Sequence, residues 1–407
     1  MAIILLIILL CFAIAQYNKY KFNTLSIFLY LLYCGSFLST IILNIYEKQE
    51  ILPLPSIYLL IVLLIWIIPF NKTNLVAKAI DSSGKKEIQL GIILSIILIP
   101  ATIFYTYEVF QLIETTGFRE NIRGDLEVQY TSKLGGFLQT MTNFFFIAEF
   151  LFFLSLVKKW NKWLIIALFF ASLSFPISVL SVYGRDGVIF WFLNFIILFF
   201  LFKPYYSKRT KRLLKIILIS FLILIFLILL IISVTRFVVK GMGGDAYFIS
   251  GTLGYFGQQL GNFSDIFYFD PKYSGTIFPG FEAYYYKYMG IVPPDSTTEL
   301  LTKSGLYEET NVFSTYVSTL YYAFGYIGAI IFSFFVLFLI KFLNGKFIKT
   351  ASLYYFMLIF IIYQIPLLGV FYYRQGLSRG DIAYFFGIVI LFCIYRLKLR
   401  KRIFINC

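Results

Sequence analysis

The sequence predicts an all-α polytopic membrane protein with about eleven transmembrane helices, and two features of its composition carry this prediction. Hydrophobic residues make up 60% of the 407 residues and charged residues only 14%, whereas soluble domains contain about 25% charged residues. The hydrophobic residues also come in blocks of roughly 15 to 25, the length of helix that crosses a hydrocarbon core of about 30 Å. We therefore expect residues 1–407 to form a single integral membrane domain.

Each hydrophobic block defines one expected span. The spans are residues 2–16, 24–46, 52–70, 88–112, 137–157, 164–182, 188–202, 213–234, 326–345, 351–371 and 381–395. The first span is short, and the sequence Ala-Ile-Ala at 13–15 resembles a signal-peptidase site. Because no basic residue precedes it, and Lys19 and Lys21 follow, we expect a signal anchor rather than a cleaved peptide.

The distribution of basic residues predicts which side of the membrane each connection faces. Counted over alternate connections, 23 of the 35 Lys and Arg residues fall on one side and 12 on the other. The positive-inside rule places the richer side, which includes the 203–215 connection and the C-terminal tail, in the cytoplasm. The N-terminus is then outside and the C-terminus inside. The same rule accounts for the net charge of +15 without nucleic acid as a partner.

Two long connections, 113–136 and 235–325, are expected on the outer side. The second contains twelve Tyr, ten Phe and twelve Gly residues, which is too aromatic for a disordered linker. We expect this large outer loop to fold back onto the membrane face, with short helices at the interface. Its tyrosine cluster at 284–288 is typical of an aromatic belt at the headgroups, or of a platform on which sugar rings stack, and the two roles are compatible.

The residue types that are missing exclude several kinds of chemistry. The chain contains no histidine, which excludes a Ser-His-Asp triad, a Cys-His pair and an HExxH zinc site. It has no GxxxxGK[ST] loop for a nucleoside triphosphate, and its four cysteines include no CxxC pair. We therefore expect neither a cofactor nor a metal.

Arginine is the chemically useful residue type on the outer side, which the positive-inside rule depletes of basic charge. Six arginines occupy four outer connections: Arg119, Arg123, Arg185, Arg236, Arg374 and Arg379. Because a guanidinium group binds phosphate through two parallel hydrogen bonds, these residues are candidate ligands of a diphosphate. The simpler alternative is that some pair with Asp125, Asp186 or Asp381, or reach lipid headgroups. Glu149, within the fifth span, and Glu108, near the outer end of the fourth, are further candidates for a catalytic acid or base, and helix pairing is the favoured role for Glu149.

Three local sequences add to this pattern. They are VYGRDGVIFW at 182–191, FPGFEAYYYKYMG at 278–290 and NVFSTYVSTLYYAFGYIGAIIFSF at 311–334. Together with the topology, they resemble the O-antigen and capsular polysaccharide polymerases of bacterial envelopes, the Wzy type. The resemblance implies a GT-C-like glycosyltransferase in the bacterial inner membrane. Such an enzyme transfers the growing glycan from an undecaprenyl diphosphate carrier to an incoming lipid-linked repeat unit.

The resemblance also implies roles for individual residues. The arginines neutralise the diphosphate leaving group, with Arg185 closest to the chemistry. A carboxylate accepts the proton of the acceptor hydroxyl, and Asp186, Glu282 and Asp245 are the candidates. The expected glycan contacts are Tyr284, Tyr285, Tyr288 and Asn311. The expected partners are the lipid-linked oligosaccharide and membrane lipid, with a chain-length regulator as a further candidate.

Two other functions share parts of this pattern. A lipid-linked glycan ligase has the same architecture, but the resemblance implies that such ligases rely on a histidine in the large loop, which this chain lacks. A lipid-linked oligosaccharide flippase or transporter usually carries charged residues deep within several spans and has short connections. The charges of this chain lie mostly at the ends of its expected spans, which favours the polymerase.

Overall fold

The computed structural model describes residues 1–47, 51–72, 75–116, 133–181, 184, 186–239, 254, 256–268, 277–291, 314–373 and 380–396. Helices make up 88% of these residues, and no strand occurs among them. The prediction of an all-α protein is therefore confirmed for the part of the chain that is described.

Every expected span coincides with a helix, or with two helices in succession. The single helices are α1 (Ala2–Tyr20), α2 (Leu25–Glu47), α5 (Lys85–Thr116), α11 (Asp186–Phe202), α12 (Lys208–Val239), α18 (Thr315–Thr350), α19 (Leu353–Leu368) and α20 (Gly380–Arg396). The composite spans are α3 (Pro53–Ile67) with η1 (Ile68–Phe70), α7 (Lys133–Thr142) with α8 (Phe145–Lys158), and α9 (Lys162–Ser172) with α10 (Ser174–Leu180). The remaining elements are α4 (Leu75–Ser82), η2 (Lys203–Tyr205), α14 (Gln259–Phe267) and α15 (Pro279–Met289).

The lengths and composition of these helices make this a membrane protein. Within the described residues, seven helices are long and apolar enough to cross a membrane by themselves. The bent pair of α7 and α8, with an angle of 49° between its halves, is an eighth candidate. Helices α19 and α20 are apolar but shorter.

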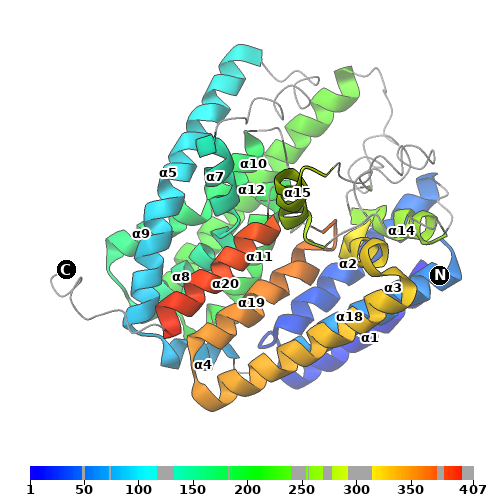
Figure 1. Ribbon diagram of the computed structural model, residues 1–407, viewed down its shortest axis with the longest axis horizontal. Coiled ribbons are helices and arrows are strands. Elements are labelled where there is room, and N and C mark those ends of the chain that lie inside the picture. Colours follow the sequence, from blue (N-terminus) through cyan, green and yellow to red (C-terminus); the bar gives the residue numbers. More distant parts are fainter. Residues whose placement is uncertain are drawn as a thin grey trace. The chain divides into compact units, whose positions relative to one another are not determined.

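The chain divides into two compact units, which are described separately. Unit 1 comprises residues 1–75, 219–344 and 359–381, and unit 2 comprises 76–218, 345–358 and 382–407. In unit 1, α1 and α2 lie side by side (Figure 1). Trp66 of α3 donates to Ser333 of α18 over 2.9 Å, and Asn344 donates to the carbonyl of Pro69 over 3.1 Å. These bonds hold the end of α3 and the following η1 against α18.

Part of the 235–325 connection is folded into the core of unit 1. All but one of the nine residues of α14 are buried. Thr40 of α2 donates to the carbonyl of Gly257 over 2.6 Å, and Tyr321 and Tyr326 both donate to the carbonyl of Phe267. A methyl group on Gly257 would lie 2.7 Å from the Ser39 backbone, so only glycine fits this close approach. The expectation of a folded loop is met in residues 256–268.

In unit 2, helices α5 and α9 run side by side in the same direction. Gly91 faces the side chains of Leu164 and Leu168, and further along Thr102 donates to the carbonyl of Phe170 over 3.2 Å. Helices α8 and α11 are joined by a polar pair, in which Asn194 Nδ2 donates to Glu149 Oε2 over 2.7 Å. Both side chains are fully buried. This contact confirms the expected helix-pairing role of Glu149.

The turn from α10 to α11 lies within VYGRDGVIFW (182–191), the first of the three sequences that carry the family resemblance (the first resemblance motif). This turn is tightly packed. The Gly184 amide donates to the carbonyl of Val179 over 2.9 Å. A methyl group on Gly184 or Gly187 would clash with the Val179 side chain. Asp186 begins α11 in this turn. Glycine is therefore required at both positions by the close approach of the chain to Val179.

Several basic residues of unit 2 lie at one end of its helices. Lys85 and Lys86 open α5, and Lys162 opens α9, which runs parallel to α5. Lys86 Nζ donates to the carbonyl of Tyr395 at the end of α20 over 2.7 Å, which places the end of α20 beside the beginning of α5. In a membrane protein, such a concentration of basic residues is typical of the cytoplasmic side.

Candidate functional site

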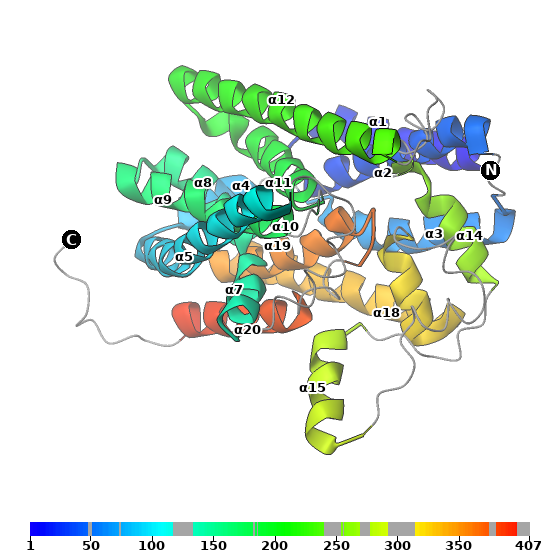
Figure 2. The same cartoon turned by 90° about the horizontal axis from the view of Figure 1, so that it is seen from above.

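The second resemblance motif folds into α15, a helix whose sequence determines both of its ends. Pro279 occupies the first turn, where its missing N–H costs nothing. Gly290 ends the helix in the left-handed conformation at φ 64°, which favours glycine. Within unit 1, α15 stands apart from the other helices (Figure 2). Its position therefore depends on a few specific contacts at its beginning.

The carboxylate of Asp381 anchors the N-terminus of α15. Its Oδ2 atom accepts hydrogen bonds from the backbone N–H groups of Gly280, over 2.8 Å, and Phe281, over 3.1 Å. These are two of the four amides that a helix cannot satisfy internally, and a carboxylate is the favoured acceptor at the positive end of a helix. A methyl group on Gly280 would collide with Asp381 Oδ1. Asp381 is only 5% exposed, so the anchor is protected from water.

A second contact holds the segment that leads into α15. Tyr373 donates from its hydroxyl to the carbonyl of Ile277 over 3.1 Å. Tyr373 and Asp381 lie on either side of the 374–379 connection, which carries Arg374 and Arg379 in the sequence. The two flanks of this arginine connection are therefore bonded to one short stretch of the 235–325 connection, residues 277–281.

The third resemblance motif, residues 311–334, is hydrogen-bonded to the residues just before the arginine connection. The Thr315 amide at the start of α18 donates to the carbonyl of Phe371 over 3.1 Å, and the Tyr316 amide donates to the carbonyl of Gly369 over 2.9 Å. Thr315 has φ 68°, which is unfavourable for a β-branched residue. Such strain persists only where the surrounding structure enforces it, and it is concentrated at functional sites. Unit 1 thus brings the second and third motifs to the two flanks of the arginine connection.

One face of α15 is covered with exposed aromatic side chains. Phe281, Tyr285 and Tyr288, at helical spacing, are 39%, 54% and 81% exposed. On another face, the Tyr286 hydroxyl donates to Glu282 Oε1 over 3.2 Å. Partial burial and the neighbouring Glu282 carboxylate raise the pKa of Tyr286, which stays protonated as the donor. The exposed face suits the stacking of sugar rings and also contact with lipid headgroups.

Most of the expected diphosphate ligands lie outside the described residues. This applies to Arg119, Arg123, Arg185, Arg374 and Arg379, and also to Asn311 and Asp245. Arg236 lies in α12 and Tyr284 in α15, and for both only the backbone is described. Asp186 belongs to unit 2 and Glu282 to unit 1, so each is described within its own unit. Binding of a diphosphate by the six arginines therefore stays a prediction.

The structure identifies three residues that the sequence did not single out as site residues: Gly280, Tyr373 and Asp381. Asp381 was considered only as a counter-ion for arginine, whereas its Oδ2 atom is bonded to the α15 backbone. Its position directly after Arg379 and Gly380 is compatible with either role, and no local pattern links it to a partner 101 residues away.

The described residues show no group of three His, Cys, Asp or Glu side chains arranged to bind a metal ion. Comparison of the chain with protein families, with curated proteins and with solved structures finds no match.

Proposed function

We propose that this protein is a polymerase of undecaprenyl-diphosphate-linked oligosaccharide repeat units in O-antigen or capsule synthesis. In this proposal the chain crosses the bacterial inner membrane eleven times, with a GT-C-like arrangement. The N-terminus and the large loop are outside, and the C-terminus is inside. The basic end of unit 2 supports this orientation, because positively charged connections are retained in the cytoplasm.

The observation that carries the proposal is the anchoring of α15 to the arginine connection. Asp381 and Tyr373 bond to residues 277–281 of the large loop. This supports a site in which Arg374 and Arg379 hold an anionic group beside a helix with exposed aromatic side chains. A diphosphate attached to a sugar chain has the chemistry that such a site would recognise.

The proposed reaction requires an acceptor hydroxyl, arginines at the leaving group and one carboxylate base. A hydroxyl group of the acceptor repeat unit attacks the anomeric carbon of the donor glycan, and the bond from that carbon to the diphosphate oxygen breaks. Arginines stabilise the departing diphosphate, the kind of preorganised electrostatic effect that usually contributes most to catalysis. Asp186, Glu282 or Asp245 takes the hydroxyl proton.

The test is polymer length in a strain that lacks the endogenous protein and carries a plasmid-borne copy. Replacing Arg185 by Ala should leave single repeat units on the surface lipid while the protein accumulates normally in the membrane. Arg185→Lys keeps the charge but loses the two-pronged geometry, so activity should fall by about tenfold or more. Lys159→Ala, an exposed change at the basic end of unit 2, is the control.

The same experiment separates the alternative functions. Loss of a ligase would leave finished polymer on its lipid carrier, not joined to the surface lipid. Loss of a flippase would keep single repeat units on the inner side, with none on the surface. Full-length surface polymer from the Arg185→Ala strain would contradict the catalytic role of Arg185.

A further inference from the structure

The break between α7 and α8 is stabilised by side chains of its own sequence. The two helices meet at 49°, and the end of a helix leaves carbonyl groups without internal partners. The Thr142 hydroxyl donates to the carbonyl of Gln139 over 2.7 Å, and Asn143 Nδ2 donates to the carbonyl of Thr140 over 3.1 Å. Residues 142–146, the break segment, are therefore held in this conformation.

On one side the break segment contacts α10, the helix that leads to Arg185 in the sequence. The Phe145 ring stacks on the Phe175 ring of α10, with 4.6 Å between their centroids. One turn further along α10, the Ser178 hydroxyl donates to the Thr142 hydroxyl over 3.4 Å. The break segment therefore supports α10 shortly before the turn that contains Arg185.

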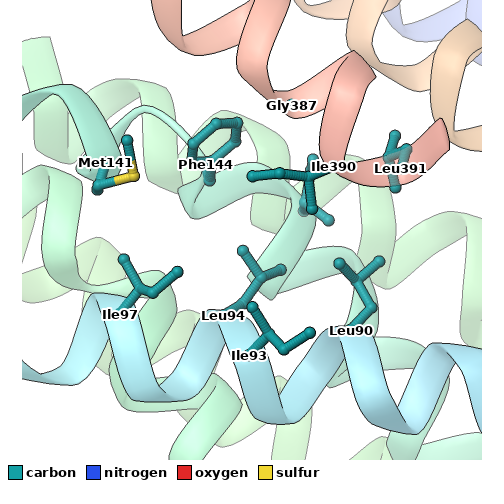
Figure 3. Close-up of a pocket in the computed structure, with 10 residues that line it drawn as sticks. Leu90, Ile93, Leu94, Ile97, Met141, Phe144, Gly387, Ile390 and Leu391 are labelled. Atoms are coloured by element: carbon teal, nitrogen blue, oxygen red, sulfur yellow. The ribbon is translucent and has the colours of Figure 1, made fainter. Parts of the chain in front are cut away.

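On another side the break segment contacts α20, the helix that follows Arg379 in the sequence. The centroids of the Phe146 and Tyr384 rings are 5.6 Å apart. The Phe144 ring lies against Gly387, where an added methyl group would be 2.6 Å from it (Figure 3). Glycine is therefore required for this close approach, and all of these contacts lie within unit 2.

The Phe144 ring has little room to move away from α20. Leu94 and Ile97 of α5 lie across a gap from it, and Met141 lines the same gap (Figure 3). The gap has a volume of about 20 Å³, roughly the room of one water, and all ten residues that line it are apolar. Because closely packed side chains transmit a displacement to their neighbours, the break segment fixes the spacing between α10 and α20.

From these contacts we infer that Phe144 is a positioning residue, which sets the separation between α10, leading to Arg185, and α20, following Arg379. The inference rests on the proposed function, in which arginines of both connections hold one diphosphate. Two guanidinium groups bind the same diphosphate only if their spacing matches its oxygens. A misplacement of about 1 Å can lower the rate by about 100-fold. Phe144 acts through the two helices and is not a catalytic residue.

The spacing is tested by the distance between spin labels at Leu180 of α10 and Phe385 of α20. The full-length protein is used, with its four native cysteines replaced by alanine. Gly387→Ala should shift this distance by about 1 Å, because a contact of 2.6 Å must open to an ordinary carbon separation. The double variant Gly387→Ala with Phe144→Leu should return toward the original distance, because leucine lacks the ring atom that clashes.

The consequence for activity is measured with the same variants as polymerisation of purified lipid-linked repeat units. Gly387→Ala should lower kcat/KM by about tenfold or more, and adding Phe144→Leu should restore most of it. The control is Gly91→Ala in α5, whose methyl group meets only ordinary contacts of 3.6 Å or more.

Three results would overturn the inference alone: an unchanged distance in Gly387→Ala, a shifted distance with a normal rate, or losses from the two changes that simply add. Failure of the unaltered protein to polymerise the units would instead refute the proposed function, and the positioning role with it.

Discussion

At the scale of single residues, Gly280 is the position where the anchor of α15 is most sensitive. A methyl group there would displace the Asp381 carboxylate, which accepts two backbone hydrogen bonds. Hydrogen bonds to a charged group contribute about 1.5–3 kcal/mol each. Gly280→Ala should therefore release α15 and reduce polymer synthesis by about tenfold or more, measured as glycan length on a gel.

The matched control for Gly280→Ala is Gly35→Ala in α2, where a methyl group would meet no atom within 4 Å. This variant should make polymer of normal length, and both proteins should reach the same level in the membrane. Normal polymer from Gly280→Ala would mean that the anchor does not matter for activity.

The buried pair of Glu149 and Asn194 gives a second prediction at this scale. Removing one partner leaves a buried polar group unsatisfied, at a cost of about 1–3 kcal/mol, whereas replacing both by apolar residues can be nearly neutral. Asn194→Leu alone should therefore lower the melting temperature of the purified protein more than the double variant Glu149→Leu with Asn194→Leu does. Additive effects of the two single changes would show that the pair is not coupled.

Residue roles were the least predictable part of the site. The crowding around Val179 explains the two glycines of the 182–191 motif, Gly184 and Gly187. The partner of Asp381 follows from the packing of segments that are distant in the sequence. A single sequence does not encode such pairs in any local spacing.

At the scale of elements, α18 is interrupted at Gly325 by a backbone conformation that is not helical. Gly325 has φ 68° and ψ −175°, a combination that is nearly exclusive to glycine. Gly325→Ala should cost about 1–3 kcal/mol. It should also shift Tyr321 and Tyr326, which bracket the break and both donate to Phe267. Thermal unfolding of the purified protein would measure this cost.

The same helix offers the control for this change. Gly345 lies in α18 with no atom within 4 Å of its added methyl position. Gly345→Ala should leave the melting temperature unchanged or raise it, because alanine favours helix by about 1 kcal/mol over glycine. Equal effects of the two changes would argue against a special conformation at Gly325.

Helix positions were predictable because hydrophobic blocks of membrane length are a direct property of the sequence. The ninth expected span began at 326, immediately after the break at Gly325. The bend between α7 and α8 and the burial of α14 were not predicted. Both depend on neighbouring helices, which hydropathy along the chain does not describe.

At the scale of the whole molecule, the proposed topology makes the firmest prediction. Reporter fusions after Arg212 and after Gly290 should lie on opposite sides of the membrane. A phosphatase that works only outside should be active after Gly290 and inactive after Arg212, and a fluorescent protein that works only inside should give the reverse pattern. Phosphatase activity at both positions, or at neither, would refute the orientation.

The hydrogen bond from the Gly280 amide to the Asp381 carboxylate also determines when α15 can be anchored during protein synthesis. The two residues are 101 positions apart, and ribosomes add roughly 5–20 residues per second. The beginning of α15 is therefore synthesised about 5–20 seconds before the residue that anchors it exists. During that interval α15 has no anchor, so the candidate site is completed only when α20 begins to form. A nascent chain that stops before residue 380 should lack an assembled site, even though every earlier helix is already made.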